Sequence, residues 1–282
     1  MKINVLGAAL ALSLMPIAKN VAQEVNDGFG YNPQSVRPIF QDDQLSRKSM
    51  WYRIDLREKQ NKPLHSKGSE LTAVIIDAVK AGILRPFSSD SLETRMTYDQ
   101  FMQNITIPNQ GNDEDGGIWD IDKDWDIDKD DTKTVVDVPK TAATNEYFAK
   151  DFKLLELKED LIFDKKRSRL YHDIQAITIY LPAEMNPTGI EKAIASFSYK
   201  ELVENVFRDN PHAIWYNNQN LHENRNLEEA FELRLFAGHL TKFSNSDDNY
   251  IEDIYGYGKS AIVSSMQVEH ATLEKESDMW EN

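Results

Sequence analysis

The stretch WYRIDLREKQNKPL, from Trp51 to Leu64, decides the fold and is the most informative part of the chain. It begins with the apolar positions of a β-strand, at Trp51, Ile54 and Leu56, and it stops at Pro63. Between these positions it crowds charges of both signs, which suit a surface that another protein recognises. The alternative is a half-buried edge strand whose charges deter aggregation. The candidate partner-contacting residues of this segment are Arg53, Asp55 and Arg57.

The residues after this strand predict two helices. Ser69 can cap the first helix, whose apolar side chains fall on one face and which Gly82 ends. Thr97 followed by Gln100 is the pattern of a capping box at the start of the second helix. The strand and the two helices predict a first α+β lobe over residues 36–107.

A β-hairpin is predicted in the second half of the chain. Residues 152–163 and 170–181 have the composition of two strands, and the sequence DKKRSR at 164–169 forms the turn between them. Four cations in six residues are unusual in an acidic protein, so the turn is a candidate contact with an acidic surface, on another subunit or on this chain's own Asp-rich run. The alternative is an ordinary polar turn. Its candidate contact residues are Lys165, Lys166, Arg167 and Arg169.

Two more helices and several short elements complete a second lobe over residues 147–282. Ser198 and Asn226 can cap the helices, and Gly238 is predicted to end the second one. The Ala-Gly turn at Gly82 has a counterpart at Gly238, so the lobes are either related repeats or similar by chance. We therefore expect an α+β fold of two small, possibly related lobes, each with short strands and one or two helices, joined by an acidic disordered linker.

The linker, residues 108–146, contains the repeat WDIDKDWDIDKD at residues 119–130. Asp at every second position resembles a calcium-binding loop, but Trp125 stands where an EF-hand needs Gly. The strong negative charge instead favours a solvated, disordered segment. The weak calcium candidates are Asp120, Asp122 and Asp124, followed by Asp126, Asp128 and Asp131.

Residues 1–22 have the pattern of a signal peptide, with Lys2 before a short apolar stretch and a possible cleavage site near Ala22. Residues 23–35 are predicted to form a flexible leader. The sequence has no Cys, which excludes a lipid-modified cysteine, disulfides and thiolate metal sites. The formal charge of −15 argues against nucleic acid and against direct membrane insertion through anionic lipids.

Catalytic and cofactor motifs are missing from the sequence. GYGKS, at Gly256–Ser260, lacks the first glycine of a phosphate-binding loop, because Asp253 stands there, and it predicts a tight turn. The histidines show no HExxH spacing, and no GxSxG nucleophile elbow occurs. The sequence therefore predicts no enzyme and no cofactor.

Four further stretches accompany the opening segment: SLETRMTYDQFMQNI (91–105), LKEDLIFDKKRSRLY (157–171), ELRLFAGHLTKFSN (232–245) and EKESDMWEN (274–282). Together the five resemble the GldN/PorN family, the periplasmic ring component of the type IX secretion and gliding motility machinery of Bacteroidota. Two features depart from the family pattern, Leu161 where Trp is usual and an end of the chain with fewer aromatic residues. The Asp-rich run is not part of that pattern.

The resemblance implies a non-enzymatic periplasmic assembly subunit. Such a subunit forms a ring oligomer at the inner face of the outer membrane with a GldK/PorK-type lipoprotein, and contacts a GldM/PorM-type motor component. The lipoprotein partner would then carry the lipid that this chain lacks. The alternative is a free-standing periplasmic calcium- or ligand-binding module, which should not co-purify in a large assembly.

Overall fold

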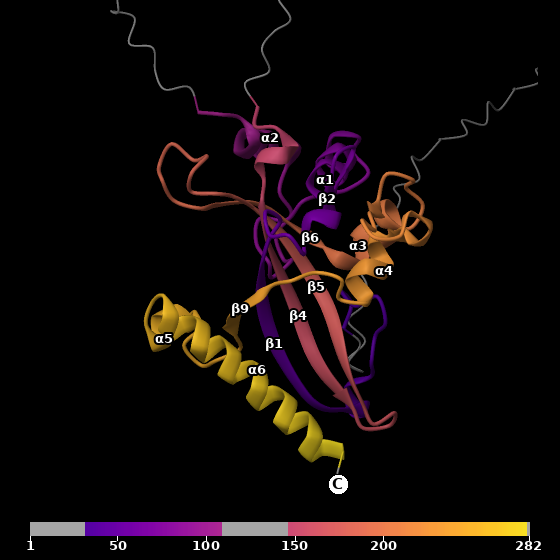
Figure 1. The fold of residues 1–282 in the computed structure, drawn as a ribbon, viewed down its shortest axis with the longest axis vertical. Helices are drawn as coiled ribbons and strands as arrows, with labels where there is room; N and C mark the ends of the chain where they lie inside the picture. The colour runs from indigo at the N-terminus through magenta and orange to yellow at the C-terminus, as the bar shows by residue number, and fades with distance from the viewer. Residues whose placement is uncertain (1–31, 109–145, 281–282) are drawn as a thin grey trace, which may run out of the picture.

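The computed structural model describes residues 32–108 and 146–280 (Figure 1). The predicted signal peptide, most of the leader and most of the acidic linker, including the six calcium candidates, lie outside these residues. Residues 32–35, which the sequence assigned to the flexible leader, are held by hydrogen bonds. The Ser35 hydroxyl donates to Asp173 (2.8 Å), and Gln34 accepts from Ser198 (2.9 Å).

A five-stranded antiparallel sheet organises the fold, in the order β6-β5-β4-β1-β9. Together with the six α-helices of the described residues, it confirms the predicted mixed α+β class. The strands are β1 (Gln44–Asp55), β4 (Leu154–Asp164), β5 (Arg169–Leu181), β6 (Lys192–Ser198) and β9 (His239–Phe243). Two-residue strands form two ribbons, β2 (His65–Ser66) with β3 (Ser69–Glu70) and β7 (Ile214–Trp215) with β8 (Arg225–Asn226).

Strand β1 lies between β4 and β9, so the two segments assigned to separate lobes contribute to one sheet (Figure 1). Its whole length pairs with β4, from Gln44 opposite Asp164 to Asp55 opposite Leu154. The strand begins seven residues before Trp51 because this pairing supplies hydrogen bonds to its polar first half. Met50 to Arg53 also pair with β9, so this part of β1 is not an edge strand, whereas Asp55 pairs with β4 alone.

Four helices cover one end of the sheet, and two of their four predicted N-caps are confirmed. The capping box is confirmed, with Thr97 accepting from the amide of Gln100, and Asn226 caps its helix by accepting from the amide of Glu228. Ser69 is not a cap, because it pairs in the β2–β3 ribbon. Ser198 precedes its helix, but its hydroxyl forms no capping hydrogen bond because it donates to Gln34. These helices are α1 (Leu71–Lys80), α2 (Tyr98–Ile105), α3 (Tyr199–Leu202), which continues as a π-turn over Val203–Phe207, and α4 (Leu227–Glu232).

The two Ala-Gly turns differ in structure. Gly82 follows α1 with a φ of 72°, a conformation that glycine adopts without strain. Helix α4 ends at Glu232, before Arg234 at a φ of 52°, so Gly238 does not terminate it. Gly238 instead precedes β9, where a Cβ atom would lie 3.1 Å from the Arg53 carbonyl oxygen. This glycine therefore allows close backbone approach to β1.

The C-terminal region is a helical arm and not the mixed short elements expected from the sequence. Helix α5 (Ile251–Tyr255) and the 22-residue helix α6 (Lys259–Trp280) are joined by a turn in which Gly256 and Gly258 have positive φ. This confirms the tight turn predicted for GYGKS. In Figure 1, α6 crosses in front of the sheet. Only three of its described residues are buried, Ala261, Ser264 and Ser265.

Candidate basic pocket and partner surfaces

The charged end of β1 is paired within the chain. The Arg57 guanidinium donates to Asp55 (2.8 Å) and to Glu184 (3.1 Å). Burial alone would raise the pKa of Asp55, but the hydrogen bonds and charge of Arg57 outweigh it and hold that pKa below its ordinary value. Asp55 and Arg57 are therefore partners of each other before any other protein is present.

Arg53 is more enclosed than Arg57, with 18% against 44% of the side chain exposed. Its Nη2 donates to Glu191 at 2.7 Å, and its guanidinium lies 4.2 Å from the centre of the Tyr180 ring. Its Nη1 is buried and has no hydrogen-bond partner among the residues that the structure describes. Arg53 is thus a structural contact, and its predicted role at a partner interface stays a prediction.

The basic hairpin joins β4 and β5, as predicted, and its tip is exposed. Asp164, whose side chain is fully buried, accepts from the backbone amides of Lys166 (2.8 Å) and Arg167 (3.2 Å) and pairs with the Arg167 guanidinium (2.8 Å). Within the two described ranges, Lys165 and Arg169 form no ion pair. These two cations remain available to an acidic surface.

The two predicted contact regions lie at opposite ends of one strand pair. The hairpin adjoins Gln44, whereas the charged segment begins at the other end of β1. A strand of 12 residues rising about 3.3 Å each separates them by roughly 35 Å. They therefore form two separate surfaces and cannot act on one small ligand.

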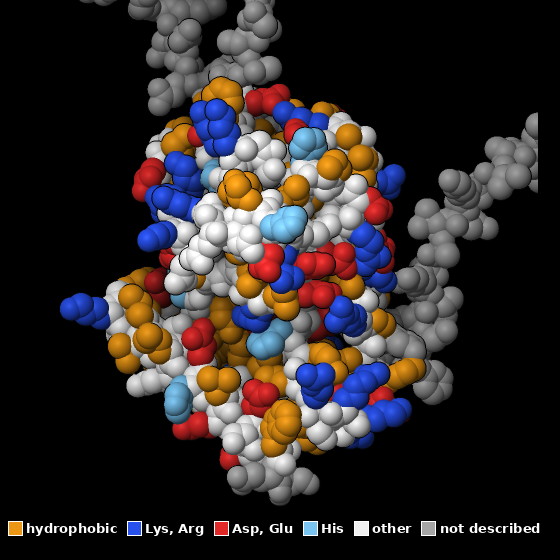
Figure 2. All heavy atoms as spheres, turned by 45° about the vertical axis from the view of Figure 1, so that its right-hand side comes forward, with side chains coloured by type: hydrophobic (Ala, Val, Ile, Leu, Met, Phe, Trp, Pro, Cys, Tyr) orange, Lys and Arg blue, Asp and Glu red, His pale blue; other side chains and the backbone are white. Residues whose placement is uncertain are grey.

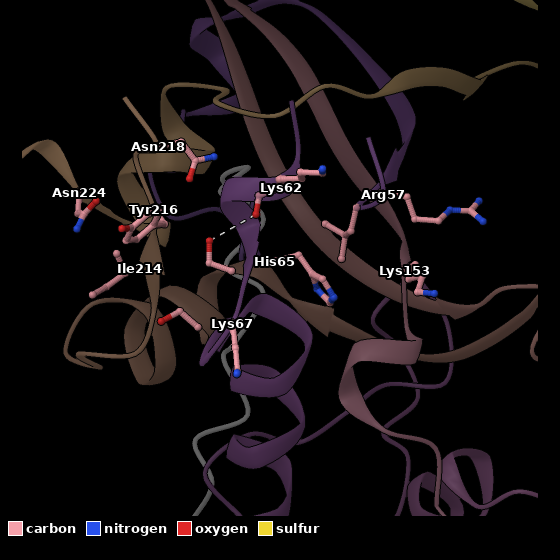
Figure 3. Close-up of a pocket in the computed structure, with 12 residues that line it drawn as sticks. Arg57, Lys62, His65, Lys67, Lys153, Ile214, Tyr216, Asn218 and Asn224 are labelled. Carbon is pink, nitrogen blue, oxygen red and sulfur yellow. Dashed lines mark hydrogen bonds between the residues drawn. The ribbon is translucent and has the colours of Figure 1, made fainter. Parts of the chain in front are cut away.

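A pocket of about 860 Å³ opens beside the charged end of β1 (Figure 3). We call it the basic pocket, because its lining includes five basic side chains and, among the twelve described residues around it, none that is acidic. The basic residues are Arg57, Lys62, His65, Lys67 and Lys153. The others are Leu56, Ser66, Ser69, Ile214, Tyr216, Asn218 and Asn224.

The loop after β1 builds this pocket, and a fully buried Asn61 fixes the loop. The Asn61 side-chain amide donates to the carbonyls of Asp55 and Ala237, both at 2.8 Å, and accepts from the amide of Ala237 at 2.7 Å. The chain then turns through Lys62 and the β2–β3 ribbon. Lys153 comes from the other half of the chain. Its backbone carbonyl accepts a hydrogen bond from the backbone amide of Leu56 (2.8 Å), which places it beside the loop.

Some cations of the basic pocket have acidic partners within the chain and others have none in the described residues. Arg57 is paired as described above, whereas Lys62, Lys67 and Lys153 form no ion pair with any described residue. Burial holds the pKa of His65 below its ordinary value despite the nearby Glu70, so His65 is neutral at pH 7. Its Nδ1 is buried and lacks a hydrogen-bond partner in the described structure. Figure 3 shows the basic side chains fanning out and not converging on one point.

The family model for the gliding motility associated protein GldN matches residues 39–281. The chain belongs to the GldN family. The match begins before β1 and ends after α6, so it spans both halves of the sheet and the helical arm. No curated protein matches this chain. The family description refers to motility and names no reaction.

Two kinds of feature are absent from the described residues of this GldN-family chain, a metal-binding cluster and a membrane-spanning helix. There, no three or more His, Asp or Glu side chains gather in a way that could hold a metal ion. None of the helices in residues 32–108 and 146–280 combines the length and apolarity of a membrane span.

Sequence reasoning missed a buried ionic cluster on the sheet of this GldN-family chain. Glu159 of β4 is fully buried, and its carboxylate accepts from Arg234 and lies 2.9 Å from His172 Nδ1. Burial alone would raise the pKa of Glu159, but His172 and Arg234 together lower it. The three residues lie on separate segments, so only the strand pairing and the loop after α4 bring them together. No local sequence signal could have revealed them.

The helical arm was also missed, and it carries much of the exposed apolar surface. Figure 2 shows hydrophobic side chains exposed in the lower part of the molecule, where α5 and α6 lie in Figure 1. Those of the arm are Ile254, Tyr255, Tyr257, Ile262, Val263, Met266, Leu273 and Trp280.

Proposed function

We propose that this chain is a non-enzymatic, periplasmic assembly subunit of the type IX secretion and gliding motility machinery. It forms a ring with a GldK/PorK-type outer-membrane lipoprotein and contacts a GldM/PorM-type motor component. The observation that carries this proposal is the GldN family match over residues 39–281. The match includes the whole sheet and the helical arm, so it concerns the entire described fold and not one motif.

The composition supports a subunit that other proteins hold at the membrane. The sequence contains no Cys to carry a lipid, so the proposal assigns the lipid anchor to the lipoprotein partner. A formal charge of −15 disfavours direct adsorption to anionic lipid surfaces. Contacts with proteins are therefore the more favourable route to the outer membrane.

The geometry offers separate regions for separate partners. The basic hairpin and the charged end of β1 are roughly 35 Å apart on a strand pair of 12 residues. Lys165 and Arg169 at the hairpin can pair with acids of a neighbouring subunit. The pairs at the other end, Arg57 with Asp55 and Glu184, can exchange partners with a second protein. A subunit that contacts two neighbours in a ring needs such separation.

Pull-down of a tagged chain from detergent-solubilised envelopes tests the proposal. We expect the lipoprotein and the motor component to be recovered with the tagged chain in a large assembly. In a strain that lacks the lipoprotein, the chain should move to the soluble periplasmic fraction. Recovery of the chain as a free monomer from wild-type envelopes would contradict the proposal and favour the free-standing module.

A further inference from the structure

We propose that the basic pocket binds an acidic peptide segment, one that presents several carboxylates in an extended form. This inference goes beyond the ring assembly, and it holds or fails whether or not the chain forms a ring.

The pocket inverts the charge of the molecule. The chain has 47 acidic residues against 32 Lys and Arg, yet the described lining of this pocket has no acid and, besides the neutral His65, four Lys and Arg residues. Lys62, Lys67 and Lys153 have no counter-ion in the described structure. Like charges gathered without counter-ions repel one another, and bound carboxylates would relieve that repulsion. The pocket is therefore complementary to an anion.

The spacing of the cations favours several carboxylates over a single phosphate. The three lysines come from different segments, Lys62 from the turn after β1, Lys67 from the β2–β3 ribbon and Lys153 from the approach to β4. Their side chains point in different directions in Figure 3. The one guanidinium, which could bind a phosphate with two parallel hydrogen bonds, is already occupied by Asp55 and Glu184.

The remaining lining suits a peptide backbone. Asn218 and Asn224 carry amides that can donate and accept hydrogen bonds, and Leu56 and Ile214 supply apolar surface between the polar groups. The buried Nδ1 of the neutral His65 has no hydrogen-bond partner within the described residues. A volume of about 860 Å³ is within the range of ligand-binding pockets.

The overall charge argues against the other polyanions. A long nucleic acid or an anionic membrane would approach the whole surface of a protein with a formal charge of −15 and would be repelled by it. A short acidic peptide is small enough that the positive potential of the pocket affects it more than the net negative charge of the protein does. Salt should weaken its binding, because exposed lysines are screened at high ionic strength.

Fluorescence anisotropy of the full chain with a labelled acidic peptide tests the proposal. The probe is the dodecapeptide WDIDKDWDIDKD, and its control has Asn in place of every Asp. We expect saturable binding of the acidic probe, weakened at high salt, and at least about tenfold weaker binding of the control. The Lys62→Gln, Lys67→Gln, Lys153→Gln triple variant should lose at least about tenfold in affinity.

A matched triple variant, Lys192→Gln, Lys259→Gln and Lys275→Gln, removes the same charge from exposed positions outside the pocket and the hairpin, and should change the affinity less than about twofold. Circular dichroism melting confirms that both variants fold. A second chain with Asn in place of the acids at 120–131 removes competition from the chain's own acidic run. The proposal would be overturned if the pocket triple variant and the control triple variant weakened binding equally. It would also be overturned if the neutral peptide bound as tightly as the acidic probe, or if the probe bound neither the natural chain nor the chain with Asn at 120–131. Displacement of the probe by inorganic phosphate alone at equal concentration would identify a single-anion site instead.

Discussion

The guanidinium of Arg53 lies 2.7 Å from the carboxylate of Glu191 and ties the end of β1 to the loop before β6. The same guanidinium stacks over Tyr180 of β5, so one side chain connects three segments of the fold. Arg53 therefore acts within the chain, whereas the neighbouring Arg57 is more exposed and pairs with Asp55 and Glu184.

Reversing these two arginines should have unequal effects on stability. Arg53→Glu places a carboxylate beside Glu191 and near the buried Glu156, and should cost about 1.5–3 kcal/mol, the range for hydrogen bonds to charged groups. Arg57→Glu should change stability by no more than about 1 kcal/mol, because its pairs are partly exposed. Thermal melting of the isolated variants measures the difference, and equal melting temperatures would contradict it. Any loss of assembly by a stable Arg57→Glu variant would then report on a partner contact.

Asn61→Ala should destabilise the chain strongly. The substitution leaves the carbonyls of Asp55 and Ala237 and the amide of Ala237 without their partner in a fully buried position. Each buried polar group left unsatisfied costs about 1–3 kcal/mol. Urea unfolding should show a lower midpoint for this variant than for Asn218→Ala, an exposed control on the same pocket. A midpoint within error of the control would mean that Asn61 does not fix the loop.

Arg234→Met should expose the cost of burying Glu159. The variant keeps side-chain bulk but removes the cation that lies near the Tyr52 ring and pairs with Glu159, at an expected cost of about 1.5–3 kcal/mol. Because the pKa of Glu159 is lowered in the fold, this stabilisation is present at neutral pH and is lost as pH falls below the ordinary value of 4.5. Arg208→Met removes a more exposed pair with Glu228 and should cost less than about 1 kcal/mol. Chemical denaturation at pH 7 measures the free energy of unfolding of both variants. Similar losses of stability in Arg234→Met and Arg208→Met would disprove a special role for Glu159.

Asp173→Asn should stabilise the chain above about pH 6. Burial is the largest influence on this carboxyl and raises its pKa to about 6, even though the Ser35 hydroxyl donates to it. A raised pKa in the fold means that stability is highest below the ordinary value of 3.8 and is lost as pH rises through 6. The variant should therefore melt above wild type at pH 7.5, by about 2–4 °C for each kcal/mol gained, with a gap that closes towards pH 4. A gap that does not vary with pH would exclude ionisation as its cause.

Elements with local signals were predictable from the sequence. The Thr97–Gln100 capping box, the Asn226 cap and the basic hairpin depend on residues within a few positions of one another, and each is present. Helix α6 was missed because its apolar residues do not form a single stripe. The start of β1 at Gln44 was missed because polar residues there gain their strand structure from β4.

The sites were less predictable than the elements, because they depend on pairing between distant segments. The sequence singles out Trp51 to Leu64, yet no spacing in the sequence places Lys153 beside Lys62 in one pocket. The same holds for Arg234 and Glu159. Charge crowding identified Arg53 but could not show that Glu191 neutralises it.

The place of β1 in the sheet also has a consequence for the order of folding. The Trp51 carbonyl accepts a hydrogen bond from Thr241, 190 residues later, and the other neighbour of β1 is supplied by β4. Contacts between residues so far apart in the sequence close large loops, and they make folding slow. During synthesis, the sheet cannot be completed until nearly the whole chain has emerged. A nascent chain of this topology therefore lacks its complete sheet until β9, at residues His239–Phe243, has been synthesised.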